Sequence, residues 1–328
     1  MPDARTSLGA ALASARRNWL VWFVVGPVAL WALVRLFGLD SGFPLATVMA
    51  FTPYVAVAAL LVAGVAVALE NWVAAAVGAL AALCLAALVL PRAIGDGTVE
   101  AAGRETLGVL SANVHHGTAD AAELVALVDR LEPDVLAIQE LTPSFAAKLE
   151  RVGLGERLPE ALLKLERGAS GSGIYADLPL RDRGEVEPTP FPFRMPRAEL
   201  ELPDGRLVRL VDVHPYPPGR GHIGVWEAAL ESLPTAGRGD PWVLAGDFNA
   251  TLDQSELRAI LDRGYRDAGN VAGEGLEPTW PDGDFDHPLP PVTIDHVLAD
   301  RRLGIVEYSV EDLPGTDHHP VHAVLALP

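Results

Sequence analysis

Polar residues follow apolar runs at several points in the second half of the chain. In VLAGDFNA, residues 243–250, the apolar run ends at Gly246 and is followed by Asp247 and Asn249. Side chains two residues apart on a strand point to the same face, so these two groups are expected to project together. An ordinary strand exit would use the same residue types, because Asp and Asn are common in turns. The remainder of the chain decides between a site and a turn.

Residues of the same kinds accompany five other strand-like segments. In chain order the full set is Asn113, His115, His116, Glu140, His214, Asp247, Asn249, Asp295, His296, Asp317, His318 and His319. Each of them alone has a structural explanation as a turn, cap or loop residue. Because sites in α/β folds assemble at strand ends, we expect the set to converge when the chain folds.

The chemistry of this set indicates a divalent metal and a phosphate ester. Carboxylate and amide oxygens suit Mg²⁺, which leaves room for phosphate oxygens in its shell. A metal together with Asp and His can hydrolyse a phosphoester by attack of water. Zinc is a competing assignment because several histidines are available, although no His-x-x-x-His helix or cysteine cluster supports it. The sequence contains neither a serine nucleophile elbow nor a phosphate loop with lysine.

Alternating strands and helices must position these residues. Hydrophobic patterning predicts strands at 107–114, 135–141, 242–248, 292–299, 303–310 and 321–327, and a hairpin at 197–214. It predicts helices near 118–131, from Pro143, at 223–233 and at 255–263, with Thr118 and Ser255 as caps. This order of elements predicts an α/β fold in which two sheets pack together.

The N-terminal part of the chain is almost purely apolar. Its three apolar segments cover residues 19–37, 45–69 and 72–91. Since a membrane-spanning helix needs about 20 apolar residues, they predict three transmembrane helices, with buried core helices or a signal peptide as the alternatives. The Arg16–Arg17 pair before the first segment places the N-terminus inside, so everything after residue 91 would lie outside the cytoplasm.

The predicted organisation therefore has four parts. They are a cytoplasmic tail at 1–18, three transmembrane helices at 19–91, a linker at 92–106 and a soluble domain at 107–328. Residues after 95 carry 40 acidic and 20 basic side chains, a balance of −20. Because nucleic-acid binding needs clustered Lys and Arg, a stable complex with nucleic acid is not expected. The sole cysteine, Cys84, lies in the third apolar segment, so no intramolecular disulfide can form.

Six motifs relate the soluble part to a known family. They are ANVHHG at 112–117, IQE at 138–140, DVH at 212–214, GDFNA at 246–250, IDHV at 294–297 and TDHHPV at 316–321. In order and spacing the chain from about 107 to 328 resembles the endonuclease/exonuclease/phosphatase family, the Mg²⁺-dependent phosphoesterases related to deoxyribonuclease I. The resemblance implies a four-layer α/β sandwich, with two packed sheets flanked by helices, and Mg²⁺ as cofactor, with Mn²⁺ as an alternative.

The resemblance also implies roles for single residues. Glu140 would be the main metal ligand, helped by Asn113, and Asp317 would lie beside the metal. Asp247 would orient or deprotonate the attacking water, and Asn249 would hold a phosphate oxygen. His318 would contact the scissile phosphate, with Asp295 fixing its tautomer, and His214 would be a second imidazole on the phosphate or leaving group. His116 and Arg194 are added as substrate-binding candidates; His115, His296 and His319 are weaker candidates.

The expected substrate is a phosphorylated molecule, and a membrane lipid phosphate is the leading class. Apolar helices tethering the site would favour a membrane-bound substrate through effective concentration. The architecture resembles membrane-anchored actinobacterial phosphatases associated with glycopeptide resistance. That resemblance implies hydrolysis of a lipid phosphate or pyrophosphate outside the cytoplasm, with a polyprenyl carrier as one such substrate. An extracellular nuclease is the alternative function, and a non-enzymatic membrane scaffold is the third. The aromatic and proline-rich stretch at 279–291 would be a loop beside the site, meeting a lipid chain or packing on the protein.

Overall fold

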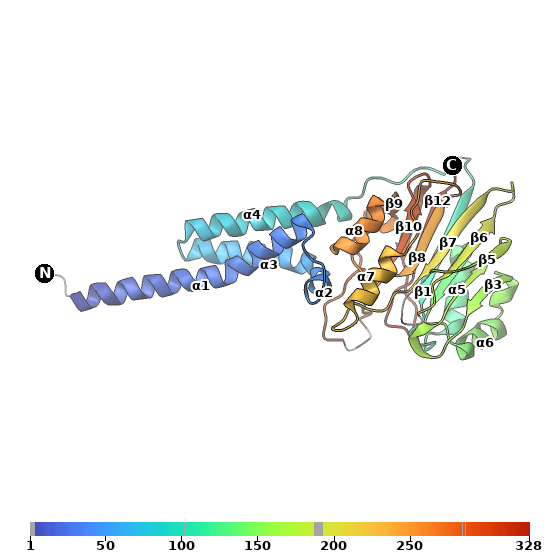
Figure 1. Cartoon of the computed structure of the whole chain (residues 1–328), viewed down its shortest axis with the longest axis horizontal. Coiled ribbons are helices and arrows are strands. Elements are labelled where there is room, and N and C mark those ends of the chain that lie inside the picture. Colours follow the sequence, from blue (N-terminus) through green and yellow to red (C-terminus); the bar gives the residue numbers. More distant parts are fainter. Residues whose placement is uncertain (1–3, 102, 187–192, 284, 286) are drawn as a thin grey trace.

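A bundle of helices extends from one end of an α/β body in the computed structural model (Figure 1). The structure describes residues 4–328 except 102, 187–192, 284 and 286, and no side chains before residue 18. The bundle consists of α1 (Ala4–Phe37), α2 (Leu45–Met49), α3 (Thr52–Ala68) and α4 (Trp72–Val89), followed by the 3₁₀ turn η1 (Leu90–Ala93). Most of the predicted N-terminal tail is therefore part of α1.

Two of these helices are long and apolar enough to cross a membrane, covering Asn18–Phe37 and Trp72–Ala93. The predicted second span at 45–69 is wrong in its extent, because it is divided into α2 and α3. Pro53 lies in the first turn of α3, where its missing N–H is tolerated, and it could not continue a helix from α2. With 17 residues, α3 is shorter than the other two, and at about 1.5 Å per residue it falls short of a full bilayer core.

The body contains two mixed sheets of six strands each, and the prediction of an α/β fold is confirmed. The first has the order β11-β12-β1-β2-β4-β3 and the second the order β5-β6-β7-β8-β10-β9. The strands are β1 (Thr106–Asn113), β2 (Val135–Gln139), β3 (Glu160–Lys164), β4 (Ser172–Ala176), β5 (Leu180–Glu185), β6 (Pro196–Glu201), β7 (Leu207–Val213), β8 (Trp242–Asp247), β9 (Tyr265–Asp267), β10 (Asp295–Asp300), β11 (Gly304–Val310) and β12 (Val321–Ala326). In each sheet one central pair, β1 with β2 and β7 with β8, is parallel, and the other pairs are antiparallel.

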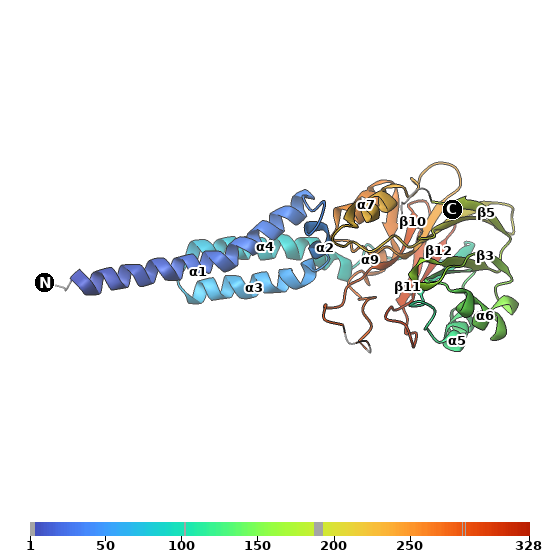
Figure 2. The same cartoon turned by 60° about the horizontal axis from the view of Figure 1, so that its bottom comes forward.

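Alternation along the strands builds the layers. Leu107 and Val109 of β1 join the core between the two sheets, whereas Leu110 and Ala112 face the opposite way, toward helices. Helices α5 (Ala121–Leu131) and α6 (Pro143–Arg151) cover the first sheet, and α7 (Ile223–Glu231) and α8 (Ser255–Asp262) cover the second. The short helix α9 (Ala268–Ala272) packs near β10 and β11. Figure 2 shows the body from a second side, with α5 and α6 on one flank and α7 on the other.

Two predicted helix caps differ from the observed ones. The cap of α5 is Asp120 rather than Thr118, because the Asp120 carboxylate accepts from the backbone N–H groups of Ala122 and Glu123. Helix α8 begins at Ser255 itself, with Gln254 in the cap position and no side-chain cap bond.

Part of the segment 92–106, predicted as a linker, packs along the body. The backbone N–H groups of Asp96 and Gly97 both donate to the carbonyl of Val271, and Val99 donates to the carbonyl of Ile305. The connection from the bundle is therefore held against the second half of the domain rather than extended between two separate parts.

Candidate active site

The strand order brings the polar ends of five strands to one edge of the sandwich. The parallel strands β1 and β2 end at Asn113 and just before Glu140, and β7 and β8 end just before His214 and at Asp247. The antiparallel strand β10 begins there with Asp295, paired in register with Asp247. Contacts between β1 and β8 and between β2 and β7 join the two sheets at this point.

A cavity of about 390 Å³ opens at this edge. Seven of the ten predicted site residues line it: His116, Glu140, His214, Asp247, Asn249, Asp317 and His318. Asn113 and Asp295 are buried and contact these residues, so nine of the ten are brought together. Arg194 is not among the residues that line the cavity.

Asn113 joins the two sheets within the site. Its amide nitrogen lies 3.1 Å from Oδ2 of Asp247 and 3.4 Å from Oε1 of Glu140. Its amide oxygen, the atom that would bind a metal, accepts from the backbone N–H of His115. The predicted metal ligand Glu140 and the predicted water-activating Asp247 therefore share one neighbour, which holds them at a fixed separation.

The turn after β8 presents Asp247 and Asn249 together. Gly246 is required before it, because a Cβ there would lie 2.0 Å from the carbonyl oxygen of Val213 in the neighbouring strand. Asn249 has a positive φ of 48°, and its amide nitrogen lies 3.2 Å from the carbonyl of Pro215 and 3.4 Å from Asp247 Oδ2. Burial, together with the charge of Asp295, raises the pKa of Asp247 to about 7, against the lowering influence of His318 and two hydrogen bonds.

His318 lies between two carboxylates. Its Nδ1 is 2.9 Å from Asp295 Oδ2, and its Nε2 is 3.8 Å from Asp247 Oδ2. Burial opposes the charged form, but the charges of Asp295 and Asp247 outweigh burial and raise the pKa of His318 to about 10. The imidazole is therefore protonated at neutral pH, with Nε2 facing the cavity.

His214 has the opposite electrostatic state. It is buried, with Nε2 3.7 Å from Asp247 Oδ2 and its ring edge against Phe193 at 4.9 Å. Burial lowers the pKa of His214 to about 4, so this imidazole is neutral at pH 7. One charged and one neutral imidazole thus lie on either side of Asp247.

Three donor groups are close enough together to hold a metal ion. Ligand atoms of Asp247, Asp295 and His318 all lie within 4.8 Å of one another, and all three residues are buried. The predicted ligands Asn113 and Glu140 adjoin this cluster through Asp247, and Asp317 Oδ1 lies 4.0 Å from His318 Nε2. Asp317 Oδ1 is buried and lies 2.6 Å from Nδ1 of His115. The carboxylates of this set and the Asn113 amide beside them fit a divalent cation, which His318 would join only as the neutral imidazole.

Three of the other candidates make contacts of a different kind. Arg194 forms ion pairs with Glu166 at 2.9 Å and Glu185 at 3.4 Å. His296 points into the protein, with its two ring nitrogens 2.8 Å from Asp267 Oδ2 and 2.9 Å from the carbonyl oxygen of Ala250. His319 lies near Asp282 and Asp312.

Phe193, Tyr216 and a buried network around the site were not assigned roles from the sequence, whereas Trp280 belongs to the stretch 279–291 that was expected beside the site. Trp280 donates from its indole nitrogen to Asp317 at 3.1 Å, and Phe193 and Tyr216 also line the cavity. Below the site, the side-chain amide of Gln139 donates to Asp212 at 2.7 Å and joins the two sheets. Gln139 belongs to the motif IQE and Asp212 to the motif DVH. Their positions, directly before Glu140 and two residues before His214, were the sequence signal that could have identified them.

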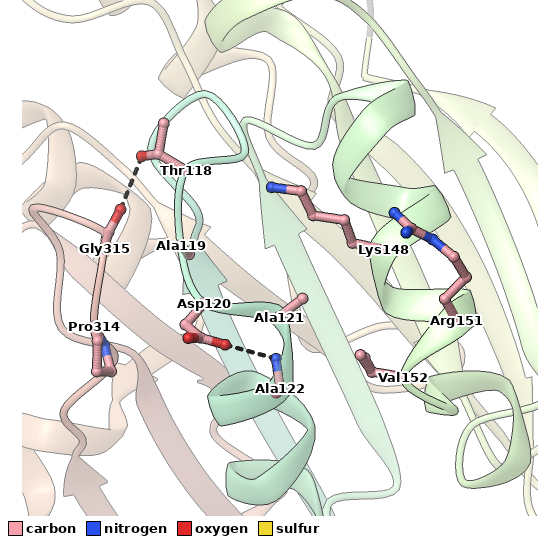
Figure 3. A pocket seen from close by; sticks show the side chains of 10 residues that line it. All are labelled: Thr118, Ala119, Asp120, Ala121, Ala122, Lys148, Arg151, Val152, Pro314 and Gly315. Atoms are coloured by element: carbon pink, nitrogen blue, oxygen red, sulfur yellow. Dashed lines mark hydrogen bonds between the residues drawn. The ribbon is translucent and has the colours of Figure 1, made fainter.

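A larger cavity of about 540 Å³ lies between the start of α5 and helix α6 (Figure 3). Lys148 and Arg151 project from α6 along one wall, and Asp120 caps α5 on the other. Thr118 forms part of the boundary with the site, because its hydroxyl donates to the carbonyls of His115 and Gly315. The smaller cavity, rather than this one, contains the clustered carboxylates and imidazoles.

Comparisons with known proteins agree with this geometry. The profile of the Endonuclease/Exonuclease/phosphatase family matches residues 110–318. Among solved structures, an endonuclease/exonuclease/phosphatase protein from Beutenbergia cavernae is 20% identical with a TM-score of 0.53, covering 68% of this chain and 72% of that one. TDP2 from Caenorhabditis elegans is 17% identical with a TM-score of 0.54, over 68% of this chain and 74% of that one.

A third structure, D. rerio TDP2 complexed with a single-strand DNA product, is 16% identical with a TM-score of 0.52, over 67% of this chain and 99% of that one. At these identities the likeness is one of fold. No curated protein sequence matches the chain.

Proposed function

The chain belongs to the endonuclease/exonuclease/phosphatase family, and we propose that this metal-dependent phosphoesterase hydrolyses a phosphate ester or pyrophosphate carried by a membrane lipid. We further propose that its N-terminal helices are embedded in the cell membrane with the N-terminus inside, so that the catalytic domain lies outside the cytoplasm.

The bundle exposes the kind of surface that a lipid bilayer covers. Large apolar side chains are exposed all along it, including Trp19 and Phe23 of α1 and Leu80 and Leu83 of α4. Among the described residues outside 19–94, only three large apolar side chains are exposed: Val99, Val152 and Leu289. Soluble monomers rarely leave so continuous an apolar surface in water.

The observation that carries the lipid proposal is the position of the site's loops against the bundle. The loop that contributes Tyr216 and Pro217 to the cavity is held at Pro218, whose carbonyl accepts from the Thr47 hydroxyl of α2 at 3.2 Å. The loop that follows Trp280 is held at Pro291, whose carbonyl accepts from the Tyr54 hydroxyl of α3 at 2.6 Å. Two loops that continue from the cavity wall thus contact α2 and the start of α3, where the head group of a lipid would lie.

The residues of the site divide the work of hydrolysis in the proposed mechanism. Deprotonated Asp247 accepts a proton from the attacking water, a role that its pKa of about 7 suits. The His318 imidazolium donates a hydrogen bond from Nε2 to a phosphate oxygen, with Asp295 fixing the ring through Nδ1. Neutral His214 and the Asn249 amide complete the phosphate contacts. When bound near Glu140, a divalent metal would polarise the phosphate as a Lewis acid.

A nuclease is the second candidate, because the D. rerio TDP2 structure was solved with a single-strand DNA product. The balance of −20 after residue 95 weakens this candidate, since nucleic acid is bound through many basic side chains. The cavity-lining residues themselves include no Lys or Arg.

The experiment uses the full chain reconstituted in vesicles with Mg²⁺ or Mn²⁺. Phosphate release is measured from a polyprenyl pyrophosphate, a polyprenyl phosphate and a soluble aryl phosphodiester, and cleavage is measured on single-stranded and plasmid DNA. We expect turnover of a lipid substrate, lost in Glu140→Gln and kept in Glu150→Gln, which alters an exposed helix residue. Cleavage of DNA without release of phosphate from either lipid would replace the proposal with the nuclease.

A further inference from the structure

The short helix α2 lies where the bundle meets the body (Figure 1) and is packed into the core of the body. Ala46 of α2 is buried in a hydrophobic cluster that includes Val213 and Phe248. Val213 directly precedes His214, and Phe248 directly follows Asp247. An element that lies between two apolar helices in the chain is therefore part of the hydrophobic core that supports the site.

Three loops that lead to the site form hydrogen bonds with α2 and the start of α3. In the first loop, Gln254 donates from Nε2 to the Ala46 carbonyl at 2.9 Å and accepts from the Thr251 N–H at 2.6 Å. Gln254 is 1% exposed, and Thr251 lies two residues after Asn249. Helix α2 therefore restrains the segment that carries Asn249.

Two hydroxyl groups of the bundle reach the other two loops. The Thr47 hydroxyl donates to the Pro218 carbonyl at 3.2 Å, directly after the cavity-lining residue Pro217. The Tyr54 hydroxyl donates to the Pro291 carbonyl at 2.6 Å. Because both acceptors are backbone groups, each bond restrains the main chain of a loop rather than a single side chain.

The Tyr54 contact continues to the site through the residue that follows Pro291. Val292 pairs with Trp280 through two backbone hydrogen bonds, of 2.6 and 3.0 Å. The indole nitrogen of Trp280 then donates to Asp317 Oδ2 at 3.1 Å. A short series of hydrogen bonds thus connects the start of α3 with a carboxylate of the site.

We propose that Thr47 and Tyr54 are positioning residues for phosphoester hydrolysis, so that α2 and the start of α3 support turnover even of a soluble substrate. A tether alone would raise the effective concentration of a membrane-bound substrate and would leave turnover of a soluble one unchanged. Loops that position reacting groups act differently, because a displacement of about 1 Å can lower a rate about 10²-fold. The inference rests on the phosphoesterase activity proposed above, and it is independent of whether the substrate is a lipid.

The test compares two tyrosine variants of the full chain in detergent, with a soluble aryl phosphodiester as substrate. Tyr54→Phe and Tyr265→Phe each remove a hydroxyl that donates to a proline carbonyl, that of Pro291 or that of Pro234. We expect kcat to fall about 10-fold in Tyr54→Phe and further in Thr47→Val/Tyr54→Phe, with the wild-type value in Tyr265→Phe. Since Tyr265 is 1% exposed and Tyr54 is 44% exposed, the melting temperature should fall at least as far in the control, so a loss of stability alone would not explain the result.

A second measurement on the same variants needs no turnover. Hydrogen–deuterium exchange at the backbone N–H groups of Trp280 and Val292 should be faster in Tyr54→Phe than in wild type and unchanged in Tyr265→Phe. Unchanged exchange there, or equal kcat values in the double variant and Tyr265→Phe, would overturn the inference. Faster exchange in a protein whose wild type hydrolyses no phosphoester would instead contradict the proposed function and leave the restraint on the loop established.

Discussion

The charge of the His318 imidazole depends on the two carboxylates beside it. Asp295 contacts Nδ1 and Asp247 faces Nε2, and both favour the protonated ring against the effect of burial. The cavity thus holds a fixed positive hydrogen-bond donor at neutral pH, next to a carboxylate whose pKa is raised to about 7. With these different protonation states, Asp247 can accept a proton while the charged His318 stabilises the negative charge of the phosphate.

Asp295→Asn should move the alkaline limb of the pH–rate profile to lower pH. Removing the Asp295 charge lowers the pKa of His318 from about 10, and since an imidazole is charged only below its pKa, the imidazolium is lost earlier as pH rises. We also expect kcat to fall by about 10²-fold, because the ring loses its orienting partner. Asp312→Asn, which alters an exposed carboxylate near His319, is the control. An unmoved alkaline limb would show that His318 need not be charged.

His296 supports the fold rather than the chemistry. Both of its ring nitrogens face acceptors, Asp267 Oδ2 and the carbonyl oxygen of Ala250, so both must carry protons. Burial opposes this charge, but Asp267 and the two hydrogen bonds outweigh burial and raise the pKa of His296. Its stabilisation is therefore complete below the unfolded-state pKa of about 6.5 and is lost as pH rises through the folded-state value.

His296→Asn should accordingly lower the free energy of unfolding by roughly 3 kcal/mol near pH 6, because Asp267 is left buried without its partner. The loss should shrink at pH values above the folded-state pKa, where wild type has also lost the charged pair. Denaturant unfolding of both proteins at a series of pH values measures the difference. A constant difference across pH would contradict the ion-pair interpretation.

Among the elements, those with a clear period or motif were predictable from the sequence. The runs predicted at 107–114, 242–248 and 321–327 correspond to β1, β8 and β12. Strands β3 and β5 were not predicted, because short edge segments with mixed burial carry little period-2 signal. Strand β4 was missed for a different reason, since it lies between β2 and β3 and all five of its residues are buried, so it shows no alternation. The site residues were predictable because each lies close to one end of an apolar run, whereas their mutual distances depend on the order of strands in two sheets.

Strands β7 and β8 pack close together because Gly246 has no side chain. Gly246→Ala would place a Cβ 2.0 Å from the Val213 carbonyl oxygen, so the strands must separate and the turn at Asp247 must shift. We expect a loss of at least about 3 kcal/mol in unfolding free energy. Gly224→Ala, in helix α7 where no atom lies within 4 Å of the new carbon, should instead stabilise by up to about 1 kcal/mol. Similar melting temperatures for the two variants would contradict this packing.

At the scale of the whole molecule, the bundle and the body are joined by buried charges. Asp253 accepts from Arg35 Nε at 2.8 Å, from Arg92 Nη1 at 2.8 Å and from Arg92 Nη2 at 2.6 Å. The side chains of Arg35 and Arg92 are 7% exposed and that of Asp253 is 1% exposed. Sequence patterns could not reveal this junction, because the arginines are 218 and 161 positions away from Asp253.

Asp253→Asn should loosen the attachment of the bundle and weaken the site together. Two buried guanidinium groups would lose their counter-charge, at a cost of roughly 3 kcal/mol. Asp253 lies four residues after Asn249, so a displaced loop should also lower kcat on a soluble phosphodiester. Melting and turnover of the full chain in detergent measure both effects.

Asp129→Asn, which breaks the exposed pair with Arg157, should cost at most about 1 kcal/mol and leave turnover unchanged. If Asp253→Asn melts and turns over like Asp129→Asn, the bundle and the catalytic domain are not coupled through this junction.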